Sequence, residues 1–353
     1  MKATFFGIVA LLALGIDAGK PRTRYVKARQ SIQKAIDAAS PGDCIHVAKG
    51  TYNEQLLIKK DGITLIGHDA QLAPPSSFKT NPCTGVMGPD SQAGICIAGK
   101  GIVLDEFIGI EHRKVRSVQK PVKGVSVSGF KVRDFIGANI LVLGAEKTRI
   151  DANKLENGGI YGFLAAGSKK TTITNNKIKM PSTLGFIALC VDDFRDAQAT
   201  GNHLSTYGIG LCVQTNGAQL RKNFITNSCA GAFVDPFTDG AVLSENTIEK
   251  PFPNCPNGTV GIIIDGATNT KVTKNIIKDQ VAAAGLVIVD DPCTGGGLAC
   301  STRPGQAAIA SNNVVKENVF QNNAFDIFIN STGTGNVAVR NQCTSPPDLC
   351  AAN

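Results

Sequence analysis

The segment Thr-Ile-Thr-Asn-Asn-Lys-Ile-Lys, residues 172–179, carries the pattern that decides the fold. Polar and apolar residues alternate over short stretches on either side of Asn176, and such alternation is typical of short strands. Ile173 lies three residues before this asparagine and Ile178 two residues after it. The same arrangement recurs along most of the chain.

The repeat is anchored on eight asparagines, each with an apolar residue three positions before it and an apolar residue or cysteine two positions after it. The anchors are 23, 26, 21, 23, 29, 43 and 23 residues apart, a unit of 22 or 23 residues with insertions. A helical repeat would need 3.6-period stripes over about ten residues per unit, and these are absent. A unit of three short strands instead forms one coil of a solenoid, in which coils stack about 4.8 Å apart and bury equivalent apolar positions. We expect the asparagines to stack at a turn as structural residues; they are Asn153, Asn176, Asn202, Asn223, Asn246, Asn275, Asn318 and Asn341.

A solenoid needs a cap over its open end. The segment 31–39 predicts a short helix with Ser31 as N-cap, an apolar face, and a stop at Pro41-Gly42. Strands over residues 44–48, 55–58 and 63–66 are predicted to follow.

The opening SIQKAIDAASPGDCIHVAKGTYNEQLLIKKDGITLIGHD, residues 31–69, resembles that of the pectin-lyase-like superfamily. The resemblance is sharp over the cap and extends by pattern from about residue 122 to 343. It implies one right-handed parallel β-helix of about ten coils with a short N-terminal capping helix, spanning residues 19–353. Length alone would allow two domains, but no linker interrupts the repeat. The superfamily includes hydrolases, lyases, epimerases, esterases and non-enzymes, so the resemblance specifies fold rather than chemistry.

Residues 1–18 read as a cleaved secretory signal, with Lys2, an apolar run over residues 5–14 and the small residue Ala18. We expect a secreted, extracellular monomer. No membrane segment is expected in the mature protein, because no other apolar run approaches about 20 residues. The formal net charge of +8 modestly favours an anionic partner. No motif suggests nucleic-acid binding. Glycans are expected at Asn257 and Asn330 if the host is a eukaryote.

Eleven cysteines in a secreted chain predict disulfides with one thiol left over. Close spacing suggests three loop bridges: Cys83–Cys96, Cys293–Cys300 and Cys343–Cys350. Equivalent places on consecutive coils suggest Cys229–Cys255 and Cys190–Cys212, although a buried thiol ladder is equally open for the second pair. Cys44 is then the unpaired thiol.

Acidic residues recur about ten positions before the anchors, where strands end. Two carboxylates about 5 Å apart repel by roughly 0.8 kcal/mol in water and about 3 kcal/mol at an effective dielectric constant near 20. A raised pKa, a bound cation or an interleaved Lys or Arg must relieve this repulsion, and active sites often tolerate it. The alternative is that these residues accept hydrogen bonds from turn amides. The column reads Ala166, Asp192, Gln214, Asp235, Asp265, Asp290 and Asn330.

The candidate catalytic residues are Asp192, Asp193, Gln214, Asp235, Asp265 and Asp290. Asp192 and Asp235 lie two coils apart, about 9.6 Å, near the upper limit for an inverting glycosidase, whereas Asp235 and Asp265 are nearer the retaining distance. We expect Asp192, Asp235 and Asp265 to face one groove with Gln214 between them. Insertions at residues 70–94, 251–258 and 292–305 are expected to wall this groove.

No known active-site pattern is complete. Asp192-Asp193 resembles the double aspartate of polygalacturonases, but Ala166 and Gln214 stand where that family has its flanking motifs. Asp–Gln–Asp over neighbouring coils resembles pectin methylesterases, and Asp235-Pro resembles the start of the Asp-Pro-His-Glu motif of mannuronan epimerases without its His-Glu. No histidine is expected to join the acidic column, and the basic run at residues 112–116 is expected to be a solvated linker rather than a glycan contact.

These patterns predict a secreted carbohydrate-active enzyme, a lyase, hydrolase or epimerase, that acts on a polysaccharide, and we expect this polysaccharide to contain uronates. A lyase would use a cation such as Ca²⁺ held by several aspartates, and a hydrolase one aspartate as acid and another as base. Two alternatives remain open: a β-helix that binds a glycan or small molecule without cleaving it, and a recruited scaffold for unusual small-molecule chemistry.

Overall fold

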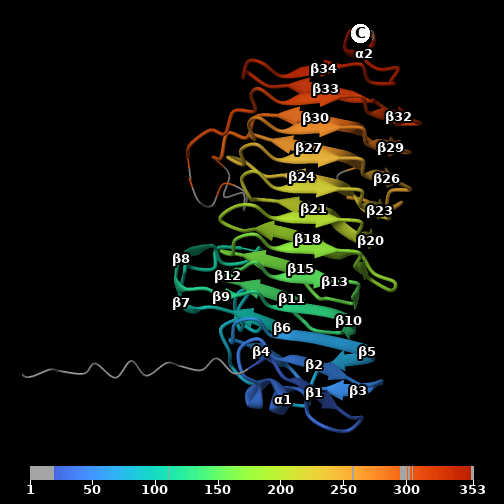
Figure 1. The fold of residues 1–353 in the computed structure, drawn as a ribbon. Helices are drawn as coiled ribbons and strands as arrows, with labels where there is room; N and C mark the ends of the chain where they lie inside the picture. Colours follow the sequence, from blue (N-terminus) through green and yellow to red (C-terminus); the bar gives the residue numbers. More distant parts are fainter. Residues whose placement is uncertain are drawn as a thin grey trace, which may run out of the picture.

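The computed structural model describes residues 20–109, 111–256, 258–294, 300, 303 and 305–350. They form a single right-handed parallel β-helix, in which the chain climbs one coil at a time from the N-terminal end (Figure 1). One face is a ten-stranded parallel sheet, here called the front sheet. This confirms the predicted fold and number of coils. The front sheet consists of β4 (Leu56–Ile58), β6 (Ala93–Ala98), β11 (Ala138–Leu143), β15 (Tyr161–Ala166), β18 (Gly185–Asp192), β21 (Tyr207–Val213), β24 (Ala230–Val234), β27 (Val260–Asp265), β30 (Ala284–Val289) and β33 (Ile327–Asn330).

The other two strands of each coil build two stacks, which the long strands β5 (Thr64–Ala73) and β10 (Ser126–Arg133) join into one 20-stranded sheet. The first stack contains β1 (Thr23–Val26), β2 (Cys44–Val47), β13 (Arg149–Asp151), β16 (Thr172–Thr174), β19 (Gln198–Thr200), β22 (Gln219–Arg221), β25 (Val242–Ser244), β28 (Lys271–Thr273), β31 (Val314–Lys316) and β34 (Val337–Val339). The second contains β3 (Gly50–Asn53), β14 (Lys154–Glu156), β17 (Lys177–Lys179), β20 (His203–Ser205), β23 (Phe224–Thr226), β26 (Thr247–Glu249), β29 (Ile276–Lys278) and β32 (Val319–Gln321).

The anchor asparagines lie at the corner between the two stacks and are structural, as predicted. Each backbone N–H donates to the side-chain oxygen of the next asparagine, for example from Asn176 to Asn202 at 3.0 Å. Each side-chain amide donates to a carbonyl of the preceding coil, as Asn202 does to Ile173 at 3.0 Å. Buried amides are costly unless they are hydrogen-bonded, so the ladder satisfies polar groups that the corner would otherwise leave unpaired. The apolar column around it, from Ile150 to Ala338, is likewise buried.

The N-terminal cap also matches the prediction. Helix α1 (Ile32–Ala38) begins at Ser31, whose side chain accepts from the N–H of Lys34. Ile32 and Ile36 are buried on its inner face. The carboxylate of Glu54 accepts from the N–H groups of Ile32 and Gln33, which the helix start leaves without internal partners. A second short helix, α2 (Pro347–Cys350), lies at the other end.

An antiparallel hairpin interrupts the parallel solenoid, and the sequence did not reveal it. Strands β7 (Lys100–Leu104) and β8 (Val115–Lys120) pair antiparallel and project from the side of the coils (Figure 1). The short strands β9 (Val122–Lys123) and β12 (Ala145–Glu146) pair parallel beside it. The prediction that residues 112–116 form a solvated linker was wrong, because this run lies in the hairpin that reaches the candidate site.

Five disulfides are present, and each joins a predicted pair. Cys83–Cys96, Cys293–Cys300 and Cys343–Cys350 bridge loops, and Cys190–Cys212 and Cys229–Cys255 join neighbouring coils. Cys44 is free, as expected. The predicted signal segment 1–18 and the sequon residue Asn257 lie outside the described residues. No helix of the described chain is long and apolar enough to cross a membrane.

Candidate functional site

The candidate site is a pocket of about 400 Å³ where β18, β21 and β24 end. Parallel pairing aligns Val191 with Val213 and Val213 with Val234. The residue after each of them therefore occupies the same place on three consecutive coils, and Asp192, Gln214 and Asp235 line the pocket together. The other lining residues are Lys114, Asp193, Phe194, Asn216, Pro236, Phe237, Thr238 and Arg303.

The hairpin delivers a lysine into this column of side chains. Lys114 Nζ lies 3.5 Å from Asp192 Oδ2 and 3.4 Å from Glu111 Oε2, and it donates to Gln214 Oε1. The side chain is only 15% exposed. Burial alone would lower the pKa of Lys114, but the charges of Asp192 and Glu111 more than offset burial, so its pKa is raised. Lys114 is therefore a fixed cation, the interleaved lysine that stacked carboxylates require.

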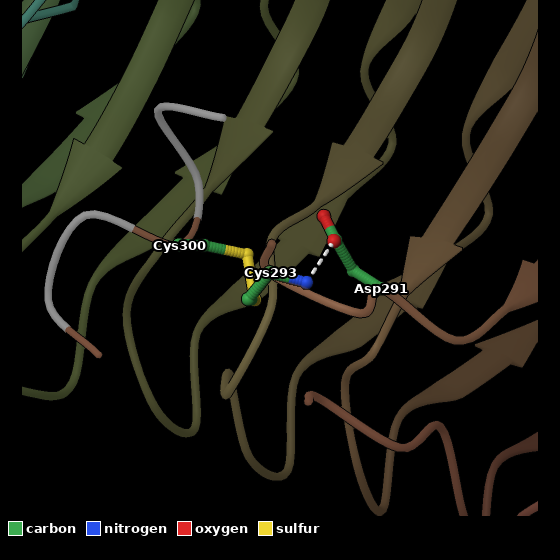
Figure 2. Close-up of side chains that lie close together, drawn as sticks. All are labelled: Asp291, Cys293 and Cys300. Atoms are coloured by element: carbon green, nitrogen blue, oxygen red, sulfur yellow. Dashed lines mark hydrogen bonds between the residues drawn. A yellow bond between two sulfur atoms is a disulfide. The ribbon is translucent and has the colours of Figure 1, made fainter. Parts of the chain in front are cut away.

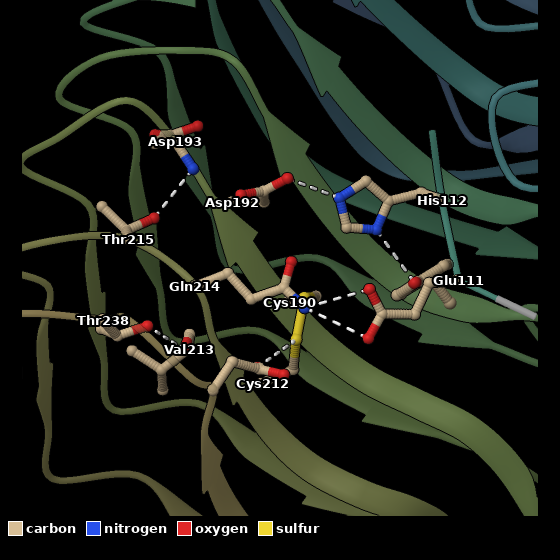
Figure 3. Close-up of a disulfide and its surroundings, with 12 residues drawn as sticks. Glu111, His112, Cys190, Asp192, Asp193, Cys212, Val213, Gln214, Thr215 and Thr238 are labelled. Atoms are coloured by element: carbon tan, nitrogen blue, oxygen red, sulfur yellow. Dashed lines mark hydrogen bonds and ion pairs between the residues drawn. A yellow bond between two sulfur atoms is a disulfide. The ribbon is translucent and has the colours of Figure 1, made fainter. Parts of the chain in front are cut away.

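Gln214 is fixed from both ends of its amide. Its oxygen accepts from Lys114, and its nitrogen donates to both carboxylate oxygens of Glu111 at 3.2 Å (Figure 3). A neutral side chain thus separates the two aspartates of the column and is held rigidly by ionised neighbours.

His112 joins the acidic column, which corrects the prediction that no histidine does so. Its side chain is fully buried, and its Nε2 lies 2.8 Å from Asp192 Oδ2 (Figure 3). Its Nδ1 lies 3.0 Å from the hydroxyl of Tyr161. A carboxylate only accepts hydrogen bonds, so Nε2 carries the proton donated to Asp192. In the neutral ring, Tyr161 then donates to Nδ1, and the three groups form a chain that orients the Asp192 carboxylate.

Asp192 and Asp235 differ sharply in proton affinity. Burial would raise the pKa of Asp192, but Lys114 and His112 outweigh burial and hold it below its usual value. The pKa of Asp235 is raised well above its usual range, first by burial and then by the charge of Glu111. One Asp235 oxygen lies 3.8 Å from the sulfur of Cys212. This sulfur is bonded to Cys190 and has no proton to donate (Figure 3). The site therefore holds two carboxyl groups, two coils apart, whose pKa values are shifted in opposite directions.

Asp193 borders the same pocket but occupies a different environment. Its carboxyl points away from Gln214 in Figure 3, and its backbone N–H donates to Thr215 Oγ1 at 2.8 Å. Burial, followed by the adjacent charge of Asp192, raises the pKa of Asp193 to about 7.

Asp265 and Asp290 are absent from the described residues that line the pocket. Asp265 follows Asp235 in the column but lies outside this pocket. Burial and the neighbouring Asp291 raise the pKa of Asp265 to about 7. The alignment of Asp290 with the column was wrong, since Asp265 pairs with Val289 and Val289 with Asn330. The Asp290 carboxylate instead accepts hydrogen bonds from the backbone or hydroxyl groups of Ala310, Ser331 and Thr332, the structural role that was the alternative interpretation.

The walls of the pocket differ from the expected loops. Arg303, in the predicted insertion 292–305, lines the pocket and stacks 4.7 Å from the ring centroid of Phe237. The expectation was wrong for the other two insertions, because no described residue of 70–94 or 251–258 lines the pocket. The hairpin also contributes to the wall, through Lys114.

A calcium ion does not fit between these acids, because the Lys114 ammonium already stands within 3.5 Å of Asp192 and 3.4 Å of Glu111. Asp291, Cys293 and Cys300 form another close group (Figure 2). Their two sulfurs are joined in a disulfide, so they offer no thiolate to a metal. Asp291 instead accepts from the N–H of Cys293 at 2.7 Å.

Four residues at or beside the site were not predicted as site residues from the sequence: Glu111, His112, Lys114 and Tyr161. The hairpin residues lie outside the repeat, so no column aligned them with the aspartates. One signal was available: Glu111-His112-Arg113-Lys114 places an acid, a histidine and cations within four residues of an insertion, and insertions of a solenoid often carry function.

Comparisons with known proteins agree with this fold. The family model described as "Right handed beta helix region" matches residues 139–347. No curated protein matches the sequence. An alginate lyase from Paenibacillus sp. str. FPU-7 is similar in structure, with a TM-score of 0.57 and 16% identity over 88% of this chain and 98% of that chain. The AlgE6 A-module of the Azotobacter vinelandii mannuronan C-5 epimerase has a TM-score of 0.58 and 16% identity over 89% of this chain and 91% of that chain. Pectate lyase Pel9A has a TM-score of 0.51 and 12% identity over 93% of this chain and 81% of that chain. Because the family model covers more than half of the chain, the protein belongs to the right-handed β-helix family.

Proposed function

We propose that the protein is a secreted carbohydrate-active enzyme that hydrolyses glycosidic bonds in an acidic polysaccharide. The observation that carries this proposal is the opposite protonation of two carboxyl groups that line one pocket. Asp235 has a strongly raised pKa and Asp192 a lowered one. Such a split within one site is the arrangement that acid–base hydrolysis requires.

In this reaction the protonated Asp235 donates its proton to the glycosidic oxygen as the bond breaks. The ionised Asp192 accepts a proton from the attacking water. Two coils separate the residues, about 9.6 Å along the backbone, which leaves room for that water and matches the inverting geometry of about 6.5–9.5 Å when the side chains lean together. Gln214, held by Lys114 and Glu111, lies between them, where it can hydrogen-bond the bound sugar.

Cations at the pocket support a uronate-containing substrate. Lys114 and Arg303 both line it, and a guanidinium or ammonium group pairs well with a sugar carboxylate. The structural neighbours include proteins named for alginate, mannuronan and pectate. Secretion is supported by the leader-like residues 1–18 and by five disulfides, which persist in oxidising compartments.

A lyase or epimerase is the second candidate, and the same two cations favour it, because neutralising a uronate carboxylate acidifies the adjacent C–H. Its base would have to be Asp192. Lys114 is held protonated, and burial raises the pKa of Tyr161 well above its usual value, so neither is ready to accept a proton.

The test is activity on a panel of acidic and neutral polysaccharides, with Asp235→Asn beside a matched Asp265→Asn variant. Both residues have raised pKa values and stand on neighbouring coils, but only Asp235 lines the pocket. We expect Asp235→Asn to lower kcat by about 10²–10⁴-fold, as for loss of a general acid, and Asp265→Asn to keep wild-type activity. Neither change should lower the melting temperature, because each removes a group that resists ionisation.

Product analysis separates the candidates. New reducing ends whose first-formed anomer is inverted support hydrolysis, whereas an ultraviolet-absorbing unsaturated product identifies a lyase. Full activity in Asp235→Asn contradicts the proposed acid. Tight binding of a polysaccharide without any product supports the non-catalytic alternative.

A further inference from the structure

The N-terminal coils carry a second hollow at a different corner of the solenoid from the candidate site. It has a volume of about 1100 Å³ and is formed by β1, β2, β5 and β10 together with the bend between β13 and β14. These elements lie at the N-terminal end of the stack (Figure 1). It is larger than the site pocket and of a size that suits an extended ligand.

A bulge in β5 creates this hollow. Ile66 pairs with Ser128 and Ala70 with Phe130, so three residues of β5 stand opposite the single Gly129. A Cβ on Gly129 would lie 2.3 Å from the carbonyl oxygen of Gly67, so the two chains approach closely at this point. The additional residues turn His68 and Asp69 outward into solvent. Bulges redirect side chains in this way and are frequent at functional sites.

An aromatic ladder lines one side of the hollow. Tyr25 stacks on His46 with 5.5 Å between centroids, and the rings of His46 and His68 lie edge to edge, 8° from parallel, with 5.1 Å between centroids. A 2.8 Å hydrogen bond joins the two imidazoles. Tyr25 is 73% exposed, the most exposed large apolar side chain in the described chain. Flat rings held rigidly in solvent present apolar faces on which the C–H face of a sugar ring can pack.

Lysines surround these rings. Lys27, Lys49, Lys131 and Lys154 line the hollow against a single acid, Asp69. Lys131 pairs with Glu156 at 2.9 Å. The other three form no ion pair with any residue that the structure describes. Unpaired ammonium groups beside exposed rings match a ligand that is both saccharide and anionic.

We propose that this hollow, formed around Tyr25, His46, His68, Lys27, Lys49 and Lys154, is a second binding surface for an acidic polysaccharide, separate from the pocket around Asp192 and Asp235. The rings hold sugar units and the lysines hold their carboxylates. The proposal concerns binding alone, so it stands or falls independently of catalysis.

The experiment is affinity electrophoresis of the full chain in native gels that contain sodium polygalacturonate or sodium alginate. An Asp235→Asn background keeps the polymer intact. Lys49→Glu should weaken retardation about fivefold through lost attraction and new repulsion. Tyr25→Ala should weaken it by about the same factor without any change of charge. Lys271→Glu, an equal charge change at an exposed lysine of β28 far along the stack, is the matched control and should retain parental binding. Gels with neutral dextran or double-stranded DNA test for sugar and charge selectivity.

Parental retardation in both Tyr25→Ala and Lys49→Glu would overturn the proposal. An equal loss in Lys49→Glu and Lys271→Glu would also overturn it, because it would reflect net charge alone. Retardation by DNA as strong as that by the acidic glycans, unchanged in Tyr25→Ala, would identify a general polyanion surface instead. A variant that loses polymer binding while the wild-type protein proves inactive on every substrate would refute the hydrolase proposal and still support this one.

Discussion

Asp193 provides a direct measure of how strongly the site resists negative charge. The residue is 4% exposed, and the weak hydrogen bonds that its carboxyl receives from Thr171 and Ser168 do not offset this burial. Burial and the neighbouring Asp192 raise its pKa to about 7. We expect Asp193→Asn to stabilise the protein at alkaline pH, because asparagine has nearly the same shape and cannot ionise.

The magnitude follows from the shift. In the unfolded chain an aspartate titrates near pH 4. The folded protein therefore binds a proton that the unfolded chain releases, and folding stability is fully present below about pH 4 and is lost as the pH rises through the folded-state value of about 7. About three pKa units at roughly 1.36 kcal/mol each give a cost near 4 kcal/mol at pH 8. Asp193→Asn should recover much of this cost at pH 8 and almost none at pH 4.

Urea denaturation at pH 4, 6 and 8 measures the difference between the variant and the wild-type protein. Asp290→Asn serves as a control of opposite sign. The Asp290 carboxylate accepts several hydrogen bonds that lower its pKa, so its loss should destabilise the protein at pH 8. A pH-independent difference for Asp193→Asn, or destabilisation at pH 8, would refute the claim that burial outweighs hydrogen bonding at this carboxyl.

Two further predictions concern the solenoid itself. Gly129→Ala should lower the free energy of unfolding by several kcal/mol, because the new Cβ would lie 2.3 Å from the carbonyl oxygen of Gly67. Gly217 also has a positive φ but nothing within 4 Å of such a Cβ, so Gly217→Ala should lower it by only about 1–2 kcal/mol. Equal shifts of the two melting curves would contradict the close approach at Gly129. Asn202→Ala removes the acceptor of the buried Asn176 N–H and should destabilise the protein by about 3 kcal/mol or more, and an unchanged denaturation midpoint would show that the ladder is dispensable.

The fold was predictable because a solenoid repeats its physical constraints at each coil. Every coil must bury an apolar residue beside the corner and satisfy the amides there, so Ile150, Ile173 and Leu220 recur in register with their asparagines. The register predicted from the sequence is wrong by one residue at the insertion after β30. Val289, and not Asp290, continues the column, because the repeat gives no information about where a strand ends before a long loop.

The sequence predicts which column residues form the candidate site, but not the difference in pKa between its two aspartates. Repetition stacks Asp192, Gln214 and Asp235 on successive coils and requires that their repulsion be relieved, but it treats the two aspartates alike. The hairpin breaks this equivalence, since its Lys114 and His112 contact Asp192, whereas Asp235 feels mainly burial and the charge of Glu111. A segment outside the repeat, with His112 80 residues before Asp192 in the sequence, thereby moves the pKa values of the two carboxyl groups apart. Acid–base chemistry on a symmetric scaffold depends on such an asymmetric insertion, which a search for repeats passes over.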